Sequence, residues 1–121
     1  MNVYVLSNPA MPGIVKIGRA IVVESRVEDL SRPTGVPLPF QIEHVELVED
    51  EVGVEYLAHA SLAPHRINPR REFFAVPVGT AIEAIQAAAL MNAWNKAGQD
   101  ARDEFLSRIE LPVFGRQAGA A

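Results

Sequence analysis

Short apolar runs separated by turn residues open the chain. Residues 2–7 and 13–18 are rich in Val, Ile and Leu, and two prolines and a glycine punctuate the turn between them. Such runs are typical of β-strands, and a short connection favours antiparallel pairing. Residues 40–48 alternate apolar and polar side chains, with a slip near His44 that indicates a bulge. This third strand is predicted at an edge of the sheet or with one face in water.

Later segments carry helical signals. Residues 22–31 place apolar side chains at i, i+4 and i+7, which predicts a short helix with one buried face. Residues 49–62 begin with acidic cap residues and end before a proline. Residues 81–97 are rich in strong helix formers and follow Thr80-x-x-Glu83, a pattern that resembles a capping box.

These elements predict an α+β fold, in which helices flank a small three-stranded sheet of antiparallel or mixed pairing. A chain of 121 residues suggests one domain. We assign residues 1–97 to this domain. Residues 98–121 are expected to form a short C-terminal helix, ending near Arg108, and a tail.

Composition narrows the classes of functional site. The chain has no cysteine, which excludes disulfides, thiolate zinc sites and cysteine nucleophiles. Its formal net charge of -4 argues against strong nonspecific binding to DNA. The charges are unevenly placed, because acidic residues gather within residues 43–55 and basic residues within residues 16–32 and 66–71. A local basic cleft on an acidic protein is one interpretation, and ordinary surface charge is the other.

A soluble cytoplasmic protein with no membrane partner is expected. The strand pattern starts at Asn2, so we expect no signal peptide. The apolar runs are shorter than the roughly 20 residues that a membrane-spanning helix needs.

Four residues from separate segments together carry the chemistry that metal-assisted phosphodiester cleavage needs. Tyr4 and Lys16 lie on the first two predicted strands, Arg26 lies on the following helix, and Glu72 precedes two phenylalanines. They supply a proton acceptor, two cations for phosphate oxygens and a hard carboxylate ligand. Each also has a structural interpretation: Tyr4 as a sheet aromatic, and the charged residues as ion-pair partners of their neighbours.

The order and spacing of these residues resemble those of the GIY-YIG endonuclease superfamily. The resemblance is greatest to the branch found in phage open reading frames and in a meiotically up-regulated fungal protein. It extends from residue 2 to about residue 85. The segments that carry it are Tyr4-Val5-Leu6-Ser7-Asn8-Pro9, Lys16-Ile17-Gly18, Ser25-Arg26, Thr34-Gly35-Val36-Pro37, Glu55-x-x-x-His59 and Arg71-Glu72-Phe73-Phe74.

The resemblance implies a role for each of the four residues. Tyr4 stands at the first motif tyrosine, a candidate general base for the attacking water. Lys16 stands where the parent motif has its second tyrosine, as it does in this branch. Arg26 matches the arginine that contacts the scissile phosphate, and Glu72 matches the carboxylate that binds one divalent ion, Mg²⁺ or Mn²⁺. The superfamily's later asparagine has no firm counterpart, although Asn92 and Asn95 are candidates.

Further candidates surround this set. His59 follows Glu55 by four residues, on the same helix face, and is either a catalytic proton relay or a structural contact. The residues expected to contact the nucleic-acid backbone are the arginines near the proposed site: Arg19, Arg66, Arg70 and Arg71.

Three functions remain open from the sequence. The first is a metal-dependent DNA endonuclease, with branched and single-stranded substrates both considered. The second is a nucleic-acid-binding module that keeps the scaffold without cutting. The third is a protein–protein interaction domain that uses residues 43–55 or 99–121, and homodimerisation through the C-terminal helix is conceivable.

Overall fold

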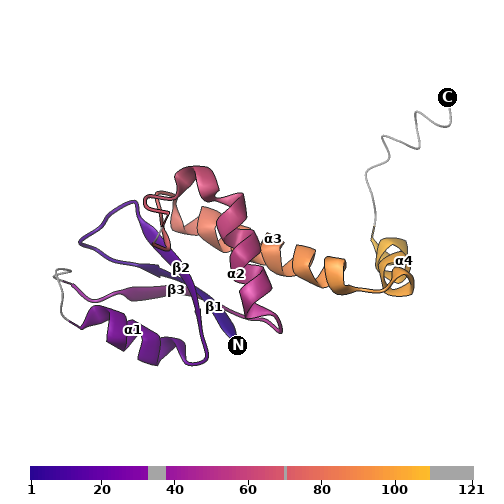
Figure 1. The fold of residues 1–121 in the computed structure, drawn as a ribbon, viewed down its shortest axis with the longest axis horizontal. Coiled ribbons are helices and arrows are strands. Elements are labelled where there is room, and N and C mark those ends of the chain that lie inside the picture. The colour runs from indigo at the N-terminus through magenta and orange to yellow at the C-terminus, as the bar shows by residue number, and fades with distance from the viewer. Residues whose placement is uncertain (33–37, 70, 110–121) are drawn as a thin grey trace.

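A four-stranded antiparallel sheet forms the centre of the computed structural model, which describes residues 1–32, 38–69 and 71–109 (Figure 1). The strand order is β3-β1-β2-β4. The strands are β1 (Asn2–Ser7), β2 (Val15–Ala20), β3 (Gln41–Leu47) and β4 (Phe73–Phe74). The α+β class and the edge position of β3 are therefore confirmed.

The sheet has one strand more than the three predicted. The additional strand is β4, whose Phe73 and Phe74 pair with Lys16 and Val15 of β2. Two residues are too few to show a periodicity, so the sequence pattern did not predict this strand. The slip at His44 is confirmed as an irregularity, because the register of β1 against β3 shifts next to that residue.

The helices are α1 (Val23–Ser31), α2 (Glu51–Ser61), α3 (Val78–Lys96) and α4 (Gln99–Arg108), with a short 3-10 turn at Ala63–His65. Helix α3 begins before the predicted start, and Pro77 occupies its N-cap position with no side-chain cap bond. The predicted capping box at Thr80 is therefore wrong, since Thr80 already lies inside the helix. Among the described residues, no helix is both long and apolar enough to cross a membrane.

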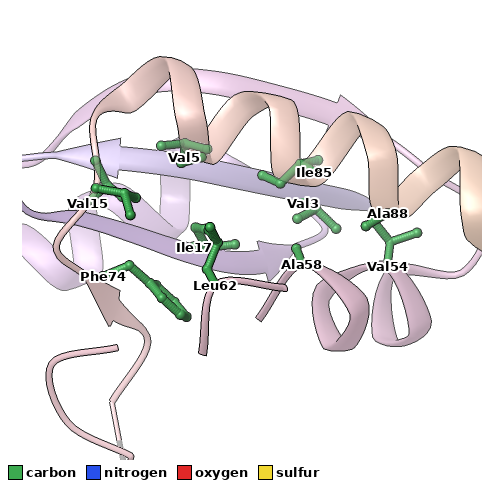
Figure 2. Close-up of a cluster of buried hydrophobic side chains, with 12 residues drawn as sticks. Val3, Val5, Val15, Ile17, Val54, Ala58, Leu62, Phe74, Ile85 and Ala88 are labelled. Atoms are coloured by element: carbon green, nitrogen blue, oxygen red, sulfur yellow. The ribbon is translucent and has the colours of Figure 1, made fainter. Parts of the chain in front are cut away.

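The sheet separates two apolar clusters, because successive side chains of a strand point to opposite faces. On one face, Val3, Val5 and Ile17 pack against α2 and α3, and Figure 2 shows them in one cluster with Ile85 and Ala88 of α3. On the other face, α1 packs on a smaller cluster that contains Tyr4, Leu6, Val23 and Phe40. Helix α1 thus lies opposite α2 and α3 (Figure 1).

The start of α2 is tied to the end of α3 by one carboxylate. Asp50, the N-cap of α2, accepts a hydrogen bond from the Gly53 amide at 3.1 Å. Its other oxygen lies 2.9 Å from the Asn92 amide nitrogen and 2.7 Å from the Lys96 ammonium. The Lys96 and Asn92 side chains, followed by the Gly53 amide, lower the pKa of Asp50 to about 2. The contact fixes where the residues of α2 lie relative to the sheet.

Helix α4 packs on the last turns of α3, which project beyond the sheet (Figure 1). The rings of Trp94 and Phe105 meet edge to face with centroids 5.7 Å apart. Arg102 donates hydrogen bonds to the carbonyl oxygens of Trp94 and Asn95 at 2.9 and 3.0 Å. Trp94 therefore joins the two C-terminal helices.

Substitution of Ile85 tests the larger apolar cluster. Ile85 is fully buried under the sheet, so Ile85→Ala removes apolar contacts and leaves a cavity. We expect a loss of about 2–5 kcal/mol in the free energy of unfolding, measured by urea denaturation. Leu90→Ala on the same helix is the matched control, because Leu90 is 61% exposed and its truncation is expected to cost less than about 1 kcal/mol. Equal losses in both variants would contradict this assignment of the core.

Candidate active site

A missing side chain at Gly18 lets the Tyr4 phenol reach the edge of β2. The two residues are direct neighbours in the β1–β2 ladder. A Cβ atom at Gly18 would lie 2.6 Å from Cζ of Tyr4, and closer still to its hydroxyl oxygen. The same position is 3.0 Å from Oε2 of Glu72. The phenol and the carboxylate therefore converge over this glycine, although 68 positions separate them along the chain.

Lys16 holds Glu72 in place. The Glu72 carbonyl accepts a hydrogen bond from the Ile17 amide at 3.1 Å, which extends the short pairing of β2 with β4. On the same side, Nζ of Lys16 lies 3.3 Å from Oε2 of Glu72 and 5.0 Å from the centre of the Phe73 ring. Lys16 is nearly buried, so this ion pair is screened less than a surface pair. The partner of Glu72 is therefore Lys16 rather than the flanking Arg71.

Tyr4, Glu72 and Arg26 line a common cavity of about 350 Å³. Burial raises the pKa of Tyr4, while a hydrogen bond from Arg26 and its positive charge act in the opposite direction. Arg26 itself is exposed on α1. The positive charge that acts on the phenol therefore comes from Arg26. The cavity is lined by Met1, Tyr4, Arg19, Ala20, Ile21, Arg26, Glu55 and Glu72.

Glu55 is a site residue that sequence analysis missed. It enters the cavity from α2, and its side chain is 14% exposed. Oε2 of Glu55 lies 3.6 Å from Nε of Arg19, yet it is buried without a hydrogen-bond partner among the described residues. Burial, followed by the charge of Glu72, raises the pKa of Glu55. The Glu55-x-x-x-His59 spacing was the available signal, but it was interpreted as a proton relay or a structural contact of His59 and gave Glu55 no role of its own.

The two carboxylates fit a hard divalent cation. Mg²⁺ prefers oxygen ligands and is commonly held by one or two carboxylates, with water and substrate phosphate completing its shell. Glu72 and the incompletely partnered Glu55 provide such oxygens in one cavity. The described parts of the chain contain no cluster of three or more metal-ligating side chains, so an all-protein cage is not available there.

His59 makes a structural contact, one of the two alternatives that its spacing to Glu55 left open, but the partner is the backbone of β2. Its Nε2 lies 2.9 Å from the carbonyl oxygen of Ile17, which requires the proton on Nε2. The ring lies 5.1 Å from that of Phe74. Burial lowers the pKa of His59, whereas the Ile17 hydrogen bond acts in the opposite direction. His59 thus links α2 to β2 on the side of the sheet away from the phenol.

The arginines that were predicted to contact phosphate lie in different surroundings. Arg19 pairs with Glu55 at the edge of the cavity. Nε of Arg66 donates a hydrogen bond to the carbonyl oxygen of Arg71 at 2.9 Å, and the Arg71 side chain is exposed. Arg70 and the Thr34-Gly35-Val36-Pro37 motif lie outside the described residues.

The candidate asparagines are not at the cavity. Asn92 bonds to Asp50, and the backbone carbonyl of Asn95 accepts a hydrogen bond from Arg102. Neither residue is among those that line the cavity with Tyr4 and Glu72.

Comparison with known families adds to this geometry. The family model described as the T5orf172 domain matches residues 1–89. The chain belongs to the T5orf172 domain family. T5orf172 domains are related to the GIY-YIG, nuclease-like families of phage open reading frames, which confirms the resemblance at that level. No curated protein and no solved structure matches the chain. A T5orf172 domain is a nuclease-like or DNA-binding module. In this chain the family match ends at residue 89, within α3.

Substitution of Gly18 tests the close approach of Tyr4. Gly18→Ala places a methyl group where the phenol lies, so the phenol or β2 must shift. We expect a loss of about 1–3 kcal/mol in the free energy of unfolding, as for other overpacked sites. Gly79→Ala is the control, because nothing lies within 4 Å of a Cβ at that helical position. Urea denaturation of both variants measures the difference. An unchanged stability of Gly18→Ala would contradict the described position of the phenol.

His59 predicts a pH dependence of stability. The folded protein keeps His59 neutral below its ordinary pKa of 6.5, whereas the unfolded chain takes up a proton there. Stability contributed by the neutral ring is therefore complete above pH 6.5 and is lost as the pH falls from 6.5 toward the lowered folded-state value. His59→Gln is expected to lose less stability over this range. Denaturation curves above and below pH 6.5 check this, and parallel pH profiles would argue against it.

Proposed function

We propose that this T5orf172 domain is a metal-dependent DNA endonuclease that hydrolyses phosphodiester bonds. The observation that supports the proposal most directly is the convergence of Tyr4, Arg26 and Glu72 on one cavity from three separate segments of the chain. Each supplies a different requirement of the reaction, and their positions agree with the family's nuclease-like character.

The charged residues divide the binding tasks between them. Arg26 is exposed at the rim and can offer a planar pair of donors to phosphate oxygens. Glu72, with Glu55 beside it, would hold the divalent ion, Mg²⁺ or Mn²⁺. Lys16 sets the position of Glu72 through the 3.3 Å contact. When bound, the cation would offset the charge that develops on the phosphoryl oxygens.

Tyr4 contributes its hydroxyl at the centre of the cavity. Because burial raises its pKa, the phenol is protonated at neutral pH. A role as general base therefore requires additional positive charge near the hydroxyl, which Arg26 supplies in part. Otherwise the hydroxyl acts by hydrogen-bonding the attacking water, and in both roles it must lie where Gly18 leaves space.

A plasmid-nicking assay tests the proposal. We expect the full chain to nick supercoiled DNA with Mg²⁺ or Mn²⁺. Arg26→Ala should reduce the rate by about 100-fold or more, as expected when one preorganised electrostatic contact is removed. Glu72→Gln should abolish nicking, because it removes a ligand charge. Glu83→Gln is the matched control, since Glu83 is exposed on α3. Nicking that survives Glu72→Gln would point to a contaminating nuclease and contradict the assignment.

A DNA-binding module that does not cut is the second candidate. Two observations favour it: Lys16 already neutralises Glu72, and neither candidate asparagine lines the cavity. The same assay separates the two functions. Binding of DNA without nicking by the unmodified chain under either metal would support the module, whereas nicking lost on Glu72→Gln would exclude it.

A further inference from the structure

A second cavity adjoins the proposed active site, and most of the residues that line it have no role in the reaction described above. Its volume is also about 350 Å³. It shares Arg19 and Glu55 with the first cavity, so the two meet where α2 passes the edge of β2. Its lining consists of Arg19, Val52, Glu55, Tyr56, His59, Ala60, Ala63 and Arg66.

Tyr56 is the distinctive member of this lining. It is 71% exposed on α2, although a tyrosine ring is a large apolar surface to leave in water. Val52, one helical turn earlier, is 53% exposed and lies on the same face. The Asp50 cap, together with its contact to Lys96, fixes the start of this helix. The ring is therefore displayed from a rigid element beside the cavity.

Two arginines line the same cavity as the Tyr56 ring. The Arg19 side chain is 45% exposed, and its contact with Glu55 uses Nε. Within the described parts of the chain, the other donors of the guanidinium are open to a phosphate. Arg66 lies over the Phe74 ring at 5.7 Å and donates through Nε to the Arg71 carbonyl. An aromatic ring and two arginines in one cavity suit a nucleotide, because a base presents a π-face and its phosphate carries negative charge.

We infer that this second cavity binds an unpaired base of the DNA strand, stacked on Tyr56, with an adjacent phosphate at Arg19 and Arg66. The inference rests on the proposed function and narrows its substrate class. A base inside a duplex is stacked on both faces and must leave the helix before it can contact an aromatic side chain. The substrate is therefore DNA with an unpaired base close to the scissile phosphate, such as a single strand or a flap.

Equilibrium binding without divalent metal tests this site separately from cleavage. Fluorescence anisotropy compares a labelled single strand, a flap and a duplex of the same sequence, using the full chain. We expect tighter binding of the single strand and the flap. Tyr56→Ala should weaken both by roughly 10-fold and change duplex binding little, while Tyr56→Phe should bind as the unmodified chain does. Leu47→Ala is the control, since Leu47 is 77% exposed on β3.

The outcomes distinguish this site from the nuclease. Equal effects of Tyr56→Ala on single-stranded and duplex DNA, or no effect, would overturn the base site even if the chain nicks plasmid. Selective weakening in a chain that fails to nick would support the base site and contradict the nuclease. Thermal unfolding of Tyr56→Ala checks that the variant is folded, and Tyr56→Trp, which keeps an aromatic face, should retain single-strand binding if the fold is intact.

Discussion

The site depends on the space that Gly18 leaves open on β2. Any larger residue there would occupy the volume that the Tyr4 phenol now fills, with Glu72 at its margin. Sheet pairing brings the chain at residue 4 next to residue 18, and β4 brings residue 72 to the same edge. Helix α1 then adds Arg26 from one face of the sheet, and α2 adds Glu55 from the other. The cavity thus depends on the strand register that places Tyr4 opposite Gly18.

Each cationic side chain in or beside the cavity is paired with a polar partner. Lys16 faces Glu72, Arg19 faces Glu55, and Arg26 faces the Tyr4 hydroxyl. Cations that already contact carboxylates attract a phosphate less strongly, so this part of the chain is not an open basic surface. Lys16, which is nearly buried, becomes available to phosphate oxygens only when Glu72 is neutralised, whereas the half-exposed Arg19 contacts Glu55 through Nε. This pairing agrees with the chain's net charge of -4.

Sequence patterns predicted the parts of the fold that rest on local periodicity. The strands β1 to β3, the irregularity near His44 and the helix with apolar side chains at Val23, Val27 and Leu30 all follow from spacing of apolar residues. Strand β4 could not be predicted from the spacing of apolar residues, because its two residues are defined by their pairing with β2. The start of α3 was missed because Thr80 carries a cap-like pattern inside the helix.

For the site, motif order indicated Tyr4, Lys16, Arg26 and Glu72, and the structure brings all four to one edge of β2. Glu55 and Tyr56 could not be assigned in this way, because their surroundings depend on how α2 packs against the sheet.

The contact of Asp50 with Asn92 and Lys96 reaches across the end of the family match. The family match ends at residue 89, yet both of these partners lie beyond it, on the part of α3 that the match does not include. A fragment trimmed to the matched region would lose the clamp on the first turn of α2. Glu55 and Tyr56, which lie about one turn further along α2, would then be held less firmly in place. The end of α3, which lies beyond the family match, therefore stabilises the start of α2, which lies within it.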